Sequence, residues 1–286
     1  MPRLLQRYTL HGLMLLPLCV YLLVFTGLPL LSCVVVSFTD AASHAFPSWN
    51  NYLTLVSLGQ FSPALRNTLW LTSVGVSLEI LCGLGVALIL HHVVWGRAVV
   101  RTIVLTPLGV PTIVAGVMFT YLFGSTGYIN AFLLRLGVID IPLDWLGGDW
   151  HSLGVLLGAE LWKVTPMVTL IMLAGLESIP ASALEAAAVD GASGWRRFWY
   201  ITLPLLRPSL TMAVVLRAID AFRIFELPLL LTGKSLPVLG TLAYSEYYEY
   251  DNPFTSAAAA SLLLGMIALC LGGYLLVMAR RQEGLS

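Results

Sequence analysis

The sequence predicts an all-α integral membrane protein with six transmembrane helices, and its composition and apolar segments carry this prediction. Apolar residues make up 58% of the 286 residues, charged residues only 10%, and the mean hydropathy is +0.87. A membrane-crossing helix needs roughly 20 apolar residues. Six segments satisfy this requirement: residues 11–36, 68–90, 102–123, 152–175, 209–231 and 255–279. Little polar sequence remains between them, so we expect a single transmembrane domain over residues 1–286.

The first apolar segment is expected to be a retained helix. It is too long for the core of a signal peptide, and no convincing small-residue cleavage site follows it. The second segment ends near His91 and His92. Adjacent residues on a helix point in different directions, so these two histidines predict the inner end of a span rather than a metal site.

Charged residues interrupt three apolar segments, although a charge at the centre of a membrane helix costs at least about 2.5 kcal/mol. They are Glu79 in the second segment, Glu160 and Lys163 in the fourth, and Arg217, Asp220, Arg223 and Glu226 in the fifth. In the fifth segment the signs alternate every three residues, so neighbours are expected to pair along one continuous helix. The Glu160 and Lys163 pair repeats this pattern.

Two interpretations of these charges remain open. They lock helices together as ion pairs, or they line a polar path in which a hydroxyl-rich solute finds hydrogen-bond partners. In the second interpretation aromatic side chains would offer faces to sugar rings: Tyr121, Trp162, Tyr244 and Tyr247. Aromatic residues near span ends are also common membrane-interface anchors.

The distribution of Lys and Arg predicts the orientation. One set of connections holds Arg3, Arg7, Arg97, Arg101, Arg196, Arg197, Arg207, Arg280 and Arg281, whereas the opposite set holds only Arg66, Arg135 and Lys234. Connections rich in positive charge face the cytoplasm. Both termini and the connection after the fourth segment are therefore expected to be cytoplasmic.

That connection carries the most informative pattern in the chain. It reads Glu185-Ala186-Ala187-Ala188-Val189-Asp190-Gly191, then nine residues, then Ile201-Thr202-Leu203-Pro204. The alanines favour a short helix from about Pro180 to Asp190, which Gly191 would end in a left-handed conformation. Ser193 is expected to cap a second helix that runs until Pro204 breaks it. Exposed charges beside aromatic rings on such an elbow suit docking on another protein.

The pattern E-A-A-x3-G-x9-I-x-L-P resembles the coupling loop of ABC importer permeases. Val189-Asp190-Gly191-Ala192, Trp195, Phe198 and the run from Ile201 to Pro208 resemble the carbohydrate branch of that family. The likeness covers nearly the whole chain. It implies the type I importer permease fold, a coupling loop at about residues 177–208, and a place in the bacterial or archaeal cytoplasmic (inner) membrane.

The resemblance also implies partners. They are a second homologous permease subunit, two ATP-binding subunits that hold ATP and Mg, an extracytoplasmic solute-binding protein, membrane lipid, and a carbohydrate or polyol as solute. This chain would bind no cofactor and no nucleic acid. The expected ATPase-coupling residues are Glu185, Ala186, Ala187, Asp190, Gly191, Trp195, Arg196, Phe198, Ile201, Leu203 and Pro204. The expected substrate-path residues are Glu160, Trp162, Lys163, Arg217, Asp220, Arg223, Glu226, Tyr244 and Tyr247.

The sequence predicts neither a catalytic site nor a metal site. Gly233-Lys234-Ser235 lacks the first glycine of a phosphate-binding loop, and Gly191-Ala192-Ser193-Gly194 lacks the last glycine of a nucleophile elbow. The four cysteines all lie inside apolar segments and are expected to be packing residues. A permease for phosphate, polyamine or another solute, and a membrane scaffold without a transport role, remain the alternatives.

One outer connection is unusual for this branch. It combines tyrosines with carboxylates: Tyr247, Tyr248, Tyr250, Glu246, Glu249 and Asp251. This composition leaves the identity of the solute open.

Overall fold

The computed structural model describes residues 14–92 and 96–283, and all regular secondary structure in these ranges is helical. A helix suits a bilayer because it satisfies its backbone hydrogen bonds within one segment. Five helical stretches are long and apolar enough to cross a membrane, and a bent pair makes a sixth if it counts as one span. The predicted all-α membrane class is confirmed. The chain termini, residues 1–13 and 284–286, lie outside the described residues.

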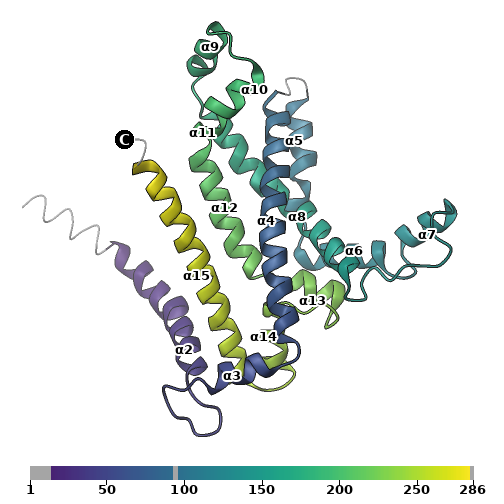
Figure 1. Cartoon of the computed structure of the whole chain (residues 1–286), viewed down its shortest axis with the longest axis vertical. Coiled ribbons are helices and arrows are strands. Elements are labelled where there is room, and N and C mark those ends of the chain that lie inside the picture. Colours follow the sequence, from purple (N-terminus) through teal and green to yellow (C-terminus); the bar gives the residue numbers. More distant parts are fainter. Residues whose placement is uncertain (1–13, 93–95, 284–286) are drawn as a thin grey trace, which may run out of the picture. The chain divides into compact units, whose positions relative to one another are not determined.

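The chain forms two compact units, which are described separately. Figure 1 labels the helices along the chain. The first comprises residues 1–61 and 242–265, and the second comprises residues 62–241 and 266–286. A single functional domain stays a prediction.

The first unit contains the span Met14–Ser37, which includes a π-helical turn η1 (Leu23–Gly27) and α2 (Leu28–Ser37). It also contains α3 (Asn50–Ser57), most of α14 (Leu239–Tyr248) and the first part of α15 (Pro253–Glu283). The Asn51 amide donates to the carbonyl oxygens of Val36, Ser37 and Thr39, at 3.4, 3.0 and 2.7 Å. These carbonyls lie in the last turn of α2 and directly after it, where the helix no longer supplies a full set of amide donors. Asn51 therefore fixes how the chain leaves α2.

The second unit contains the remaining helices in chain order. They are α4 (Phe61–His92), α5 (Arg97–Leu105), η2 (Thr106–Gly109), α6 (Thr112–Phe123), α7 (Tyr128–Arg135), α8 (Trp150–Glu177), α9 (Ala181–Val189), α10 (Gly194–Arg197), η3 (Phe198–Thr202), α11 (Leu203–Leu205), α12 (Arg207–Phe222) and α13 (Glu226–Thr232).

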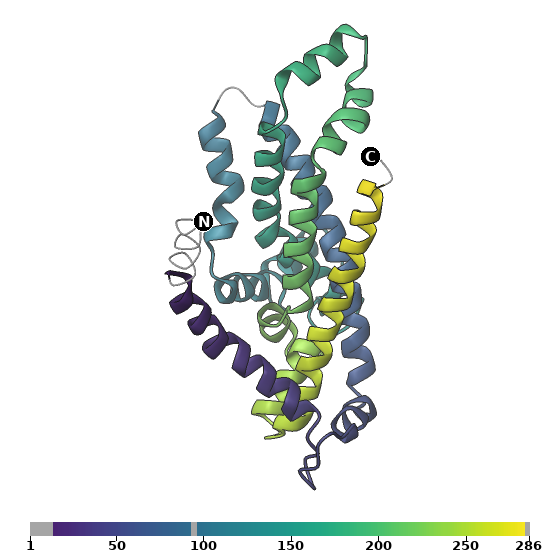
Figure 2. The ribbon, with the colours of Figure 1, turned by 90° about the vertical axis from the view of Figure 1, so that its left-hand side faces the viewer.

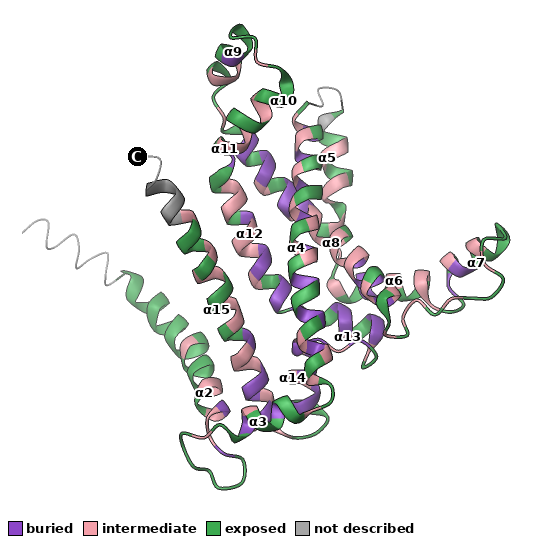
Figure 3. Cartoon of the chain, viewed as in Figure 1, coloured by how far each residue is buried: buried purple, intermediate pink, exposed green. Residues whose placement is uncertain are grey.

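Two clusters of buried apolar side chains hold the second unit together, and Figure 3 shows the buried residues along α4, α8 and α12. One cluster joins α4, α8 and α13 through Leu71, Leu156, Ala159, Ile224, Leu227, Leu231, Leu236 and Val238. The other joins α4, α8 and α12 through Ala87, Leu90, Val168, Met172, Leu173, Leu176, Leu206 and Ala213. Because the clusters involve different stretches of α4 and α8, these two helices pack along much of their length.

Small residues permit the close approach of these helices. A Cβ atom on Gly83 of α4 would lie 2.5 Å from Cγ1 of Val168 on α8. A Cβ atom on Gly175 of α8 would collide with Ser209 and would lie 2.8 Å from Leu206. Helices in membranes commonly pack through such small residues, which bring their backbones close.

The third predicted span, residues 102–123, is wrong as a continuous helix. α5 ends at Leu105, η2 follows, and α6 begins only at Thr112. Pro111 disfavours helical geometry at the preceding residue, and Val110 is extended, with φ −81° and ψ 124°. The apolar span in this region is instead Thr112–Arg135, which combines α6 and α7.

The fifth predicted span, residues 209–231, is also interrupted. α12 ends at Phe222, and α13 starts at Glu226. In one continuous helix the ring of Pro228 would clash with the carbonyl of Ile224 and leave it without a donor. The predicted second, fourth and sixth spans agree with α4, α8 and α15, and the first agrees over its described part.

We predict that Gly83→Leu lowers the free energy of unfolding by about 1–3 kcal/mol, because the larger side chain overpacks the contact with Val168. Gly85→Leu is the matched control, since a Cβ at Gly85 meets no atom within 4 Å. Thermal unfolding of the purified chain in detergent measures both. Equal midpoints for the two variants would contradict the close contact of α4 with α8.

Candidate functional site: a coupling elbow and a buried polar layer

The elbow predicted after the fourth span is present. α9 spans Ala181–Val189, and Gly191 has φ +75°, the left-handed conformation expected of a residue that ends a helix. The Ser193 hydroxyl accepts a hydrogen bond from the Arg196 amide at 3.4 Å and caps α10. Figures 1 and 2 both show α9 and α10 projecting beyond the ends of α8 and α12. We call α9 to α11 the elbow.

Pro204 does not break the second elbow helix as the sequence predicts. The π-helical turn η3 precedes it, and the Leu203 amide donates to the Phe198 carbonyl five residues back. Pro204 then lies in the first turn of α11, where a missing amide costs little. The chain bends by 64° between Leu205 and Arg207 instead.

The elbow presents apolar and charged side chains to the surroundings. Val189 is 88% exposed, Tyr200 81% and Trp195 72%. Among the predicted coupling residues, Glu185, Ala186, Asp190, Gly191, Trp195 and Arg196 are exposed, Phe198, Ile201, Leu203 and Pro204 are half-buried, and Ala187 is buried. Trp195 lies edge-on to Trp199, with ring centres 5.6 Å apart. Large exposed aromatic residues beside charges are typical of protein interfaces.

Sequence reasoning did not include Val189 and Tyr200 among the coupling residues. Their signal was present, because each is a large apolar or aromatic residue in a stretch predicted to be exposed. They add to the surface that the elbow offers a partner.

An ion pair ties the start of this region to α5. Arg101 Nη2 lies 2.5 Å from Glu177 Oε1, at the end of α8. Both side chains are partly exposed, so the pair contributes only about 0–1 kcal/mol to stability.

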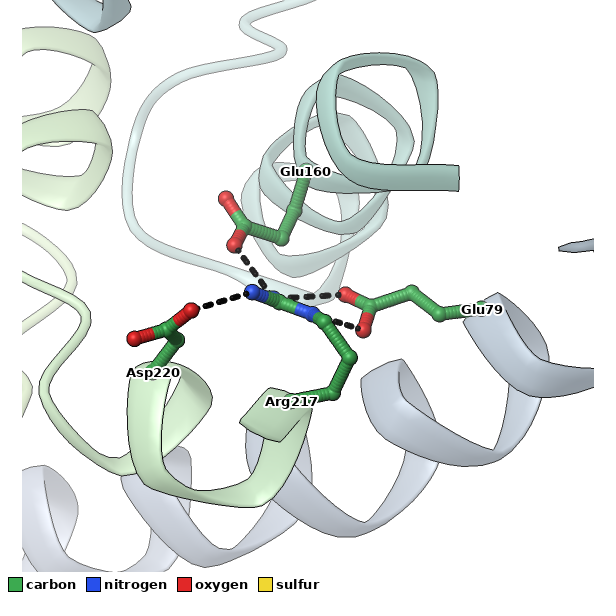
Figure 4. Close-up of polar contacts among 4 residues, drawn as sticks. All are labelled: Glu79, Glu160, Arg217 and Asp220. Atoms are coloured by element: carbon green, nitrogen blue, oxygen red, sulfur yellow. Dashed lines mark hydrogen bonds and ion pairs between the residues drawn. The ribbon is translucent and has the colours of Figure 1, made fainter. Parts of the chain in front are cut away.

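Four charged residues form a polar layer inside the second unit: Glu79, Glu160, Arg217 and Asp220 (Figure 4). The Arg217 guanidinium donates to both oxygens of Glu79, from Nε at 2.8 Å and from Nη2 at 3.3 Å. It also reaches Glu160 at 3.1 Å and Asp220 at 3.2 Å. One side chain thus links α4, α8 and α12.

The layer runs from the interior to the surface. The side chains of Glu79 and Arg217 are 1% and 3% exposed, that of Glu160 is 15% exposed, and that of Asp220 is 53% exposed. The bidentate contact with Glu79 satisfies the most buried charge, as a guanidinium in a dry site requires. Arg217 therefore forms a buried ion pair with Glu79 and also holds the exposed carboxylate of Asp220 in place.

The predicted pairing of charges along one helix is right only for Arg217 and Asp220. Beyond them the helix ends, and Arg223 caps α12 while Glu226 opens α13; both are exposed. Glu160 reaches across to Arg217, whereas Lys163 Nζ donates at 3.0 Å to the Val110 carbonyl that the break before α6 leaves open.

The remaining path residues are not members of the layer. Trp162 is on α8, and its ring centre lies 5.9 Å from that of Phe119. Tyr244 and Tyr247 lie on α14 in the first unit. Glu79 is a partner that sequence reasoning did not select. The sequence signal for Glu79 was a lone carboxylate in an apolar segment. The sequence did not indicate its partner, because Arg217 is 138 residues away in the chain.

No group of three or more His, Cys, Asp or Glu residues that could hold a metal ion occurs in the described part of the chain.

We predict that Arg217→Leu destabilises the chain by about 3–5 kcal/mol, because Glu79 and Glu160 would remain as buried charges without a counterion. Arg223→Leu is the control, since Arg223 is exposed and the change should cost less than about 0.5 kcal/mol. Thermal unfolding in detergent measures the difference. Similar losses of stability in both variants would contradict a stabilising role of the polar layer.

Comparison with known proteins identifies the family. The family described as "Binding-protein-dependent transport system inner membrane component" has a model that matches residues 79–279. A trehalose/maltose transport system permease protein MalF of Thermococcus litoralis is 42% identical over 257 residues, covering 86% of this chain and 85% of that protein. A trehalose transport system permease protein SugA of Mycobacterium tuberculosis is 37% identical over 230 residues, covering 79% and 72%.

The solved structures agree on the fold. A bacterial ABC transporter involved in the import of the acidic polysaccharide alginate contains a chain that matches with a TM-score of 0.83 and 24% identity, covering 98% of each chain. Because the family model matches residues 79–279 and two transport permeases are 42% and 37% identical to it, this chain belongs to the family of binding-protein-dependent transport system inner membrane components.

Proposed function

We propose that this chain is a permease subunit of an ABC importer that takes up a neutral carbohydrate, in the class of trehalose and maltose. The observation that carries the proposal is the 42% identity to a trehalose/maltose permease over 86% of the chain. A second homologous permease subunit and two subunits that bind ATP and Mg complete the complex. An extracytoplasmic binding protein delivers the solute, and both termini and the elbow face the cytoplasm.

The elbow couples this chain to an ATP-binding subunit. Its exposed Val189, Trp195 and Tyr200 supply apolar contact area, and Glu185 and Arg196 supply charges at the edge. α9 follows α8 after only Ser178, Ile179 and Pro180. A displacement of the elbow is therefore transmitted directly to the packed helices. They move as one rigid body and switch access to the solute path from outside to inside.

The polar layer supplies part of the solute path. Asp220 keeps an accessible carboxylate that Arg217 orients, and Arg223 and Glu226 are exposed close by in the chain. Such groups exchange hydrogen bonds with the hydroxyls of a neutral sugar without requiring a charged solute. Trp162, Tyr244 and Tyr247 are further path candidates.

The importer reconstituted with its binding protein should hydrolyse ATP faster in the presence of one sugar of this class. We would test a panel of sugars, sugar phosphates, polyols and polyamines, and measure phosphate release. Stimulation by a disaccharide or another neutral sugar is the expected result. Stimulation by only a polyamine or phosphate would retain an importer and contradict the carbohydrate class, and no stimulation by any solute would contradict the import function.

Gly191→Val should abolish solute uptake while membrane insertion stays normal, because a β-branched residue is strained at φ +75° and the elbow would change its angle. Gly194→Ala is the matched control: its site is open and Gly194 lies in ordinary helical conformation in α10. Uptake of labelled solute by cells with equal amounts of each variant measures the effect. Solute uptake at the wild-type rate by the Gly191→Val variant would contradict the coupling role of the elbow.

A further inference from the structure

The two halves of the elbow carry opposite charges. The first half, residues 181–190, contains Glu185 and Asp190 and no Lys or Arg. The second half is Gly194–Leu205, and α12 begins directly after Leu206. From residue 191 to residue 207 the chain contains no Asp or Glu, and its charged side chains are Arg196, Arg197 and Arg207. An anionic lipid surface therefore attracts the second half and repels the first.

The second half of the elbow runs across the direction of α12. Its axis makes an angle of 64° with the axis of α12. By composition the two are together apolar enough to cross a membrane, but the bend prevents them from crossing as one straight span. Transmembrane helices are tilted by about 20° on average, so with α12 in the membrane the second half runs obliquely along the membrane surface. An apolar helix with arginines in this orientation is typical of an interfacial helix.

The polar layer indicates how deep the second half lies. Glu79 and Glu160 belong to the middle parts of α4 and α8, which places the layer near the centre of the bilayer. Arg207 precedes Arg217 by ten residues, which is about 15 Å along a helix and half the thickness of a hydrocarbon core. On the orientation proposed above, Arg207 lies at the cytoplasmic boundary of that core. Figure 1 shows α10 and α11 between α12 and the more distant α9.

Four side chains in this region are not part of the proposed coupling surface, and they suit a lipid interface. Trp199 is 47% exposed and Leu205 46%, Arg207 is exposed, and Arg197 is half-buried. The Trp199 ring lies edge-on to Phe198, with ring centres 5.3 Å apart. Tryptophan is enriched at the level of the lipid headgroups, and guanidinium groups bind phosphate with paired hydrogen bonds. We call Arg197, Trp199, Leu205 and Arg207 the interfacial surface.

The ATP-binding subunit fits this surface less well than lipid does. The interfacial surface adjoins the start of a membrane-crossing helix, where headgroups are the nearest neighbours, whereas α9 projects farther out (Figure 1). Its two arginines also have no carboxylate nearby in the chain with which to pair. Lipid phosphates in the cytoplasmic leaflet supply that negative charge.

We propose that the interfacial surface binds anionic headgroups of the cytoplasmic leaflet, and that this contact holds the bend between the elbow and α12. The inference rests on the proposed function, since it requires the cytoplasmic orientation of the elbow. The elbow then has two partners: the coupling surface contacts the ATP-binding subunit, and the interfacial surface contacts lipid. A bend held by lipid transmits a displacement of the elbow to α12 instead of absorbing it.

Fluorescence quenching in the complete importer tests the contact. The native cysteines are replaced, a bimane label is placed at Trp199→Cys or Leu205→Cys, and the importer is held in nanodiscs that contain phosphatidylglycerol. Val189→Cys on α9 is the matched control, because Val189 is 88% exposed on the half that the proposal keeps away from lipid. A nitroxide on the lipid headgroup should quench both test labels at least about twofold more strongly than the control. Iodide in the water should quench the control more strongly.

A second measurement tests the role of charge. The double variant R197Q/R207Q, combined with the label at Leu205→Cys, should lose about half of the quenching by the headgroup nitroxide. In the unlabelled importer, replacing phosphatidylcholine by phosphatidylglycerol should raise solute-stimulated ATP hydrolysis at least about twofold, and R197Q/R207Q should abolish this rise. Arg66→Gln is the matched control, because Arg66 is an exposed arginine near the opposite end of α4, and it should preserve both effects.

Equal quenching by the headgroup nitroxide at Leu205→Cys and Val189→Cys would overturn the membrane contact. Protection of both test labels from both quenchers would assign the surface to the ATP-binding subunit and would overturn it too. Full quenching and a full lipid response in R197Q/R207Q would overturn the recognition of anionic headgroups. The proposed function fails separately, because quenching requires only the assembled complex, whereas an importer that responds to no carbohydrate would contradict that function.

Discussion

The packing of the second unit depends on the ion pairs that the Arg217 guanidinium makes. Its side chain is buried, and it contacts Glu79 of α4, Glu160 of α8 and Asp220 of its own helix. In α4 and α8 these charges lie between the stretches that contribute to the two apolar clusters. Apolar packing alone would let membrane helices slide or rotate with little cost, because lipid is as apolar as the core. A buried charge whose partners sit on other helices permits one register, since any other leaves it uncompensated.

This constraint explains how the elbow can act at a distance. α8 carries Glu160 in its middle, and α9 begins just after its end. Close packing at Gly175 sets α8 against Leu206 and Ser209, where the chain bends into α12. Both ends of the elbow therefore join helices that the polar layer holds together. The proposed coupling needs no flexible linkage, because displacement of the elbow displaces that packed group as a whole.

Much of this architecture is readable from the sequence, and the errors have physical causes. The apolar segments predicted the spans because lipid imposes length and composition. Gly191 and Ser193 predicted the elbow because their conformational preferences are local. The third and fifth spans were wrongly predicted as continuous helices, since apolar composition masked the effects of Pro111 and Pro228 on the neighbouring backbone. The pairing of Arg217 with Asp220 was predicted, because a spacing of three residues on one helix is local. The pairing with Glu79 could not be predicted, because Glu79 is 138 residues away in the chain and its contact depends on how α4 packs.

If α4, α8 and α12 move as one rigid body, two spin labels on these helices keep the same separation. Labels at Leu81 of α4 and Met212 of α12 lie on exposed positions of helices that the polar layer joins. The native cysteines would be replaced, and the interspin distance would be measured in the reconstituted importer with and without ATP. We expect the interspin distance to change by less than about 2 Å. A shift of about one helical turn, roughly 5 Å, would contradict it.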